Sequence, residues 1–115
     1  MPSLNIIKAR QYPNTRIILA YSGMGSMLLT EAYITAKECE NIYLETSWTS
    51  AEDIEWLVKN IGGDRILFGS DFYSDSCYRQ IIEIEKYKII NISDEDKVNC
   101  LFKKSKEVFN LNIGV

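Results

Sequence analysis

Asp71 is the residue whose type and position in this sequence most directly suggest chemistry. It follows the apolar run 66–68 after only two residues, Gly69 and Ser70. Ligands of α/β proteins bind at the carboxyl ends of parallel strands, so a carboxylate there could bind a metal ion or act as a general base. The alternative interpretation is structural: Asp71 caps the following loop, and Ser70 forms local turn hydrogen bonds.

Polar and aromatic residues also follow the two other apolar runs. Run 17–20 is followed by Tyr21, and shortly after run 42–44 come Thr46 and Trp48. If the three runs are parallel neighbours, these side chains share one rim with the carboxylate after the third run. Aromatic side chains at this rim would either line a pocket or cover the end of the sheet. They are Trp48, Phe72 and Tyr73.

A glycine-containing turn offers a second kind of site. Gly23, Met24 and Gly25 lie between the first apolar run and a segment with helical spacing, where backbone N–H groups could bind a phosphate. Glu45 would then contact the ribose of a nucleotide. The third glycine of a G-x-G-x-x-G motif is replaced by Leu28. The glycines could equally serve only to allow a tight turn from strand to helix.

Histidine is absent from the sequence. Ser-His-Asp and Cys-His catalysis are therefore excluded within this chain, as is any metal site with a histidine ligand. The cysteines Cys39, Cys77 and Cys100 form no C-x-x-C pair, and their odd number predicts a cytoplasmic location, where thiols stay reduced. We expect each of them to be a small buried hydrophobic residue rather than a reactive thiol.

The overall composition excludes two classes of partner. The chain has 115 residues and a net charge of −3, and its Lys and Arg residues form no dense stripe, so we expect no nucleic-acid binding. No apolar run is long enough to span a bilayer, and we expect no membrane association. The length suffices for one hydrophobic core, which predicts a single domain over residues 1–115.

These candidate residues require a fold that brings the strand ends together. Runs 17–20, 42–44 and 66–68 are nearly continuous, which is typical of strands buried on both faces of a parallel sheet. Segments with helical spacing separate them, and Ser50 and Ser93 are predicted N-caps. The expected order is αβαβαβαα, an α/β fold of βαβ units with a three-stranded parallel sheet. Such a sheet has two open edges, which another copy or a larger assembly would cover.

The pattern resembles the C-terminal part of the amidohydrolase-related family, which comprises metal-dependent TIM-barrel hydrolases and decarboxylases. The resemblance is carried by segments 12–20 and 41–47 and especially by 62–72, which reads Gly-Gly-Asp-Arg-Ile-Leu-Phe-Gly-Ser-Asp-Phe. The tail 92–111 is similar to the closing helix of that family. The resemblance covers nearly the whole chain.

This resemblance implies that the three runs are the last three strands of a TIM barrel. It implies hydrolysis of an amide or ester, or a decarboxylation, with a divalent metal ion, zinc above all, as the cofactor. Asp71 would be the metal-facing aspartate that deprotonates the attacking water. Tyr21, Thr46 and Trp48 would shape the pocket for a small-molecule substrate in a full barrel.

The sequence also departs from the family pattern. The His-x-His pair of the first strand is missing, and the usual Ala-His-x-Gly is here Ala20-Tyr21-Ser22-Gly23. A neutral phenol does not replace imidazole as a metal ligand. Because three does not divide eight, copies of the chain cannot close a standard barrel by rotation.

We therefore expect a fragment or remnant that lacks its N-terminal portion, binds no metal tightly and has no activity alone. The alternative is a non-catalytic α/β module that acts by self-association or by docking on a partner subunit. A weaker alternative is phosphate or nucleotide binding at the turn Gly23-Met24-Gly25.

Overall fold

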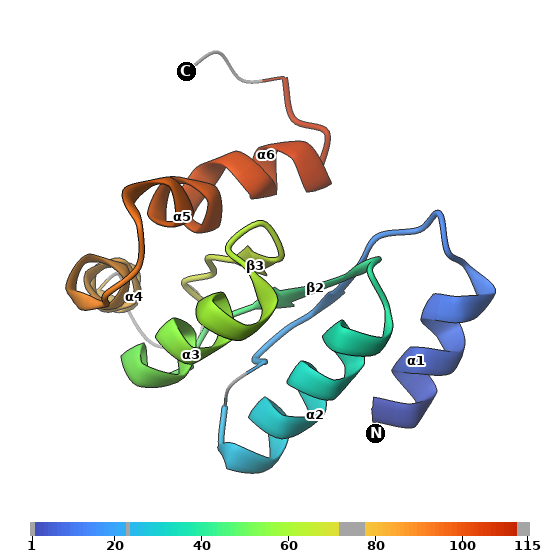
Figure 1. The fold of residues 1–115 in the computed structure, drawn as a ribbon. Coiled ribbons are helices and arrows are strands. Elements are labelled where there is room, and N and C mark those ends of the chain that lie inside the picture. The colour runs from blue at the N-terminus through green and yellow to red at the C-terminus, as the bar shows by residue number, and fades with distance from the viewer. Residues whose placement is uncertain (1, 23, 72–77, 113–115) are drawn as a thin grey trace.

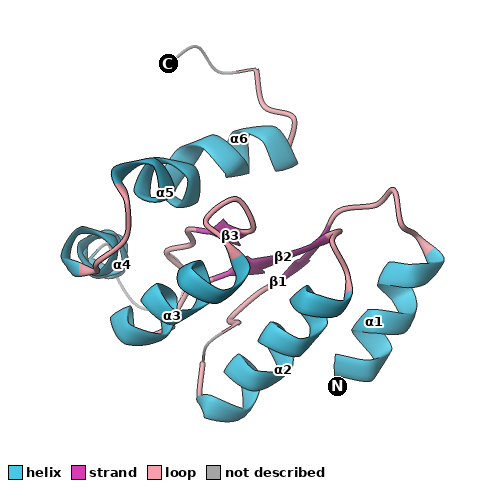
Figure 2. Cartoon of the chain, in the orientation of Figure 1, coloured by secondary structure: helices cyan, strands magenta, loops and turns pink. Residues whose placement is uncertain are grey.

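The fold was analysed in a computed structural model, which describes residues 2–22, 24–71 and 78–112. Helices and strands alternate along most of the chain, and the last elements are helical (Figures 1 and 2). In order they are α1 (Pro2–Gln11), β1 (Ile17–Leu19), α2 (Ser26–Glu38), β2 (Ile42–Glu45), α3 (Ala51–Ile61), β3 (Ile66–Leu67), α4 (Tyr78–Ile89), α5 (Asp94–Val98), the π-helical turn η2 (Asn99–Lys103) and α6 (Lys104–Val108). This order confirms the predicted α/β fold.

The strands form one parallel sheet in the order β1-β2-β3. Ile17, Ile18 and Leu19 of β1 pair with residues 42–44 of β2, and the end of β2 pairs with β3. Because all three strands run in the same direction, their carboxyl ends lie at the same end of the sheet, as the sequence pattern predicts.

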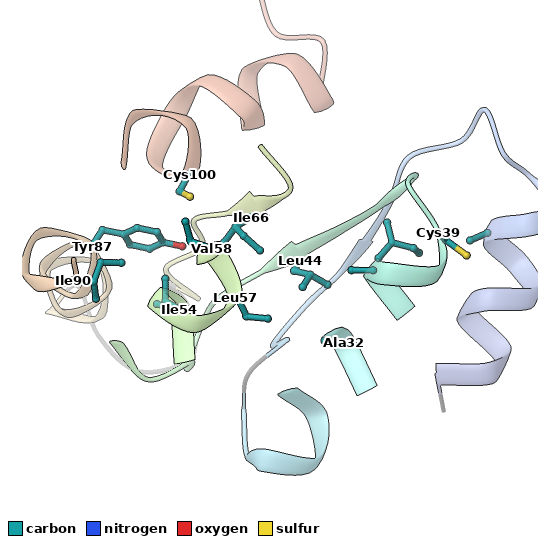
Figure 3. Packing of buried hydrophobic residues seen from close by; sticks show 13 residues of the cluster. Ala32, Cys39, Leu44, Ile54, Leu57, Val58, Ile66, Tyr87, Ile90 and Cys100 are labelled. Atoms are coloured by element: carbon teal, nitrogen blue, oxygen red, sulfur yellow. The ribbon is translucent and has the colours of Figure 1, made fainter. Parts of the chain in front are cut away.

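The hydrophobic core lies between this sheet and its helices (Figure 3). Ile42 and Leu44 of β2, Ile66 of β3 and Leu57 of α3 are completely buried, and Tyr87 points from α4 into the same cluster. The prediction that all three runs are buried on both faces is wrong for β1, whose three residues are only half-buried, and for β2, where Tyr43 on one face is half-buried. β1 is the first strand in the sheet order, and so one of its sides lacks a neighbouring strand among the described residues.

The predicted helix caps are confirmed. The Ser50 side chain accepts a hydrogen bond from the backbone N–H of Asp53 at 3.1 Å, and the Ser93 side chain accepts one from Asp96 at 3.1 Å. Each bond satisfies one of the N–H groups that a helix leaves unpaired at its first turn. At the other end of α3, Gly62 has a φ of 112°, a conformation that side-chain-bearing residues rarely adopt.

The prediction of two open sheet edges holds only in part on the β3 side. Backbone groups of Leu67 face β2, so those of the next residue, Phe68, point away from the sheet. The Phe68 N–H donates to the carbonyl of Cys100 at 2.9 Å. Cys100 belongs to η2, where the Lys104 N–H donates to the carbonyl of Asn99, five residues earlier. This spacing makes the turn wider than a turn of an α-helix. The C-terminal helical segment thus packs against this side of the sheet and accepts one outward N–H just beyond β3.

The cysteines that the structure describes behave as predicted. Cys39 and Cys100 are buried free thiols, and burial raises the pKa of Cys100 to about 12, so this thiol stays protonated and unreactive near neutral pH. Cys77 lies outside the described residues. Among the helices that the structure describes, none is long and apolar enough to cross a membrane.

Candidate functional site

Three side chains, one from the segment after each strand, meet at the end of the sheet where the strands finish. The Tyr21 hydroxyl, just beyond β1, donates to Oδ1 of Asp71 at 3.1 Å. The Trp48 indole Nε1–H, in the loop after β2, donates to Oδ2 of the same carboxylate at 2.7 Å. Tyr21, Trp48 and Asp71 therefore form one hydrogen-bonded group, which we call the strand-end cluster. Its existence agrees with the predicted common rim.

All three members of the strand-end cluster have a left-handed backbone conformation. Their φ angles are 56° at Tyr21, 64° at Trp48 and 49° at Asp71, and the other such non-glycine residue among those described is Asn110. This conformation costs on the order of 1–3 kcal/mol for a residue with a side chain, and it concentrates at functional sites. The surrounding contacts must therefore hold each strand end in place.

Helix α4 supplies the contacts that hold Trp48. The Trp48 backbone N–H donates to Oε1 of Glu83 at 3.2 Å, and the guanidinium of Arg79 lies 3.9 Å from the indole ring centre. Glu83 is completely buried and forms ion pairs with Arg79 and with Lys86. Lys86 also donates to the carbonyl of Thr49 at 2.8 Å. This buried charge cluster fixes the loop after β2 against α4.

Sequence reasoning did not find this charge cluster. Arg79, Glu83 and Lys86 have the spacing of ordinary helical ion pairs. The burial that makes them important arises only when α4 packs on the loop after β2. The only sign of this cluster in the sequence was an arginine, a glutamate and a lysine within eight residues of one helix.

Glu45 holds the ends of β1 and β2 together. Its Oε2 accepts from the Tyr21 backbone N–H at 3.1 Å, and its Oε1 accepts from the backbone N–H of Ser47 at 2.7 Å and from the Ser47 hydroxyl. Gly69 lies directly against this carboxylate, because a Cβ at position 69 would overlap Glu45 Oε1. Both carboxylate oxygens thus have structural partners, and the geometry gives Glu45 a positioning role rather than one at a ribose.

Thr46 lies below the rim. Thr46 is completely buried. Its hydroxyl lies 2.5 Å from the Tyr87 hydroxyl and donates to the Leu67 carbonyl at 3.3 Å. The structure therefore brings Tyr21, Trp48 and Asp71 together but places Thr46 in the layer that supports them.

The strand-end cluster also affects the acidity of its phenol. The hydrogen bond to Asp71 raises the pKa of Tyr21 above its ordinary value of 10, and repulsion between phenolate and carboxylate raises it further. Tyr21 is therefore a neutral hydrogen-bond donor at physiological pH.

The glycine turn is described only in part. Gly23 lies outside the described residues, as do Phe72 and Tyr73. Gly25 precedes α2 with a φ of 86°, which fits the interpretation that the glycines allow a tight turn.

The residues of this chain do not fit a metal centre on their own. Within the described ranges, no three His, Cys, Asp or Glu side chains gather where they could hold an ion. Asp71 accepts from Tyr21 and Trp48 on its two oxygens, and a tyrosine stands where the resemblance implies a histidine. A zinc site in a protein needs three or four ligands, so one carboxylate with two neutral donors is insufficient.

Comparison with known proteins gives one finding. A family model described as amidohydrolase matches residues 2–97. The match includes all three strands and the whole strand-end cluster. A search of curated proteins finds no match.

Proposed function

The chain belongs to the amidohydrolase family, and from that premise we propose that it is the C-terminal portion of a TIM barrel, forming strands six to eight and inactive alone. The family match supports a hydrolase-type relationship, and residues 1–115 form one partial domain in this proposal. The complete barrel would hydrolyse an amide or ester of a small molecule or decarboxylate it.

The observation that carries this proposal is the position of Asp71. It lies at the carboxyl end of the last strand, where α/β barrels bind substrate, and Tyr21 and Trp48 orient its carboxylate. In the complete protein Asp71 would accept a proton from water, while Tyr21 and Trp48 would form part of the pocket wall.

The proposal assigns no metal ion to this chain alone. The family generally uses divalent ions, and zinc is the ion that the resemblance implies, but the strand-end cluster has too few ligands for one. Any further ligands would come from outside the residues described here. The buried free thiols Cys39 and Cys100 support a cytoplasmic location, which is part of the same proposal.

Zinc retention and turnover test this proposal together. The purified chain is loaded with zinc, dialysed and measured for bound metal, and then assayed with p-nitrophenyl acetate. We expect substoichiometric zinc and no hydrolysis above the buffer rate, in the wild type and in D71N alike, because a tight site needs more ligands. One equivalent of zinc that D71N abolishes would contradict the proposal, as would D71N-sensitive turnover.

A second candidate function is a non-catalytic α/β module that docks through its sheet edge. The half-buried strand β1, whose outer side has no partner strand among the described residues, favours it. Its partner would be either a second copy or a different subunit.

A further inference from the structure

Trp48 is held at two points, and each point has a different partner on helix α4. Its backbone N–H donates to Glu83, whereas the guanidinium of Arg79 lies over its indole ring, 3.9 Å from the ring centre. Trp48 is 40% exposed, so packing alone does not fix the rotation of its ring about the side-chain bonds. Contact with the guanidinium therefore fixes a part of Trp48 that the bond to Glu83 does not reach.

Arg79 is well suited to this contact because it is shielded from water. The residue is only 8% exposed, although it carries a full positive charge. The attraction between a cation and the face of an indole is strongest when the cation is desolvated. A planar guanidinium also stacks on an aromatic ring, which the compact ammonium of lysine does not do.

The hydrogen bonds of Arg79 do not by themselves account for its position. Its Nε–H is buried and has no hydrogen-bond partner in the part of the chain that the structure describes, and such a donor costs free energy. Lys86 already donates to both carboxylate oxygens of Glu83 at 3.0 Å, so that charge has a second cation. The guanidinium thus lies over the indole at the expense of a hydrogen bond that its Nε could otherwise form.

The orientation of the indole decides whether Trp48 reaches Asp71. The Nε1–H donates to Oδ2 at 2.7 Å, and a hydrogen bond of this kind weakens steeply when the N–H turns away from its acceptor. Rotation of the ring would remove the indole from Oδ2 and release one restraint on the carboxylate. The position of Arg79 is in this way transmitted to an oxygen that it does not touch.

We propose that Arg79 is a positioning residue, which orients the indole of Trp48 and through it the carboxylate of Asp71. Glu83 holds the main chain of the same tryptophan, so the two α4 residues have separable effects. The inference deepens the proposed function and rests on it for the statement that Asp71 takes a proton. Its test needs neither metal nor substrate, so the zinc and turnover experiment does not decide it.

The experiment measures hydrogen exchange with water at two sites of Trp48, the indole Nε1–H and the backbone N–H, by NMR of the ¹⁵N-labelled full chain. R79K keeps the positive charge but loses the planar group. D71A removes the acceptor and calibrates the loss of the bond. K88M is the control, since it removes an exposed cation from the same helix. The other tryptophan, Trp56, supplies a second indole signal.

We expect D71A and R79K each to speed exchange of the Trp48 indole N–H about tenfold or more, because both break its bond to Asp71. In R79K the backbone N–H of Trp48 should exchange within about twofold of the wild-type rate, because Glu83 keeps its charge and still accepts from it. K88M should change neither site, and the Trp56 indole should exchange alike in every protein.

A second measurement needs no substitution at position 79. The aromatic ring current of Trp48 should shift the side-chain protons of Arg79 upfield relative to those of Arg10, which is exposed. W48L should abolish the shift. This comparison decides the point if R79K does not fold.

Four outcomes would overturn the proposal. One is indole exchange that R79K leaves unchanged. Another is equal acceleration of the indole and backbone sites in R79K, which would mean that the loop loosens as a whole. The third is indole exchange that D71A leaves unchanged. The last is the absence of an upfield shift at Arg79 in the wild type.

Discussion

Asp71 accepts hydrogen bonds from two neutral donors that reach it from other strand ends, and this arrangement defines the chemistry of the rim. A carboxylate whose oxygens are oriented by a phenol and an indole can take a proton or bind a polar ligand. The left-handed backbone at Tyr21, Trp48 and Asp71 indicates that the fold tolerates strain to bring these side chains together.

The first residue-scale prediction concerns Tyr21. In D71N the pKa of Tyr21 should fall back toward its ordinary value of 10, because both the strong acceptor and the negative charge are removed. The measurement is an NMR titration of ¹³C-labelled tyrosine rings in the wild type and in D71N. An unchanged Tyr21 titration would show that the hydrogen bond to Asp71 is absent in solution.

At the scale of elements, helix α4 matters for the site because its buried charges hold Trp48. Glu83 is completely buried and is the anion that faces both Arg79 and Lys86. A buried charge left without its partner is costly, even where the intact pair contributes little net stability. The position of the strand-end cluster therefore depends on a side chain that does not touch Asp71.

Replacing Glu83 tests this dependence. We expect E83Q to lower the free energy of unfolding by about 3–5 kcal/mol, since it leaves Arg79 and Lys86 without their anion. Urea unfolding at pH 7 measures the loss. The control is E85Q on the same helix, which breaks an exposed pair with Lys88 and should cost less than about 1 kcal/mol. Equal losses in the two variants would mean that the Glu83 ion pairs are solvated.

The features that sequence predicted are those with local causes. The apolar runs, the caps Ser50 and Ser93, and the placement of Asp71 after the last strand depend on residues within a few positions. The contact of Glu83 with Trp48 and the bond from Phe68 to Cys100 join residues more than thirty positions apart. No local pattern encodes such contacts, because they depend on how helices pack after the sheet has formed.

At the scale of the whole molecule, the free energy of unfolding in alkaline solution should depend on the packing of Cys100 against β3. Cys100 is completely buried behind β3, and its pKa is raised from an ordinary 9 to about 12, mainly by burial. Burial also raises the pKa of Tyr87. Each group keeps its proton in the folded chain at a pH where the unfolded chain has lost it. The unfolded state then binds fewer protons, so the free energy of unfolding must fall as the pH rises.

For Cys100 this loss begins near pH 9 and continues to about pH 12, with a slope approaching about 1.4 kcal/mol per pH unit. Urea unfolding of the wild type and of C100A at pH 7, 9 and 10.5 isolates the thiol. C100A should be less stable at pH 7 because it leaves a small cavity, but its stability should decline less steeply above pH 9. Parallel declines in the two proteins would mean that the thiol is accessible to water, and the packing of η2 against β3 would then not hold in solution.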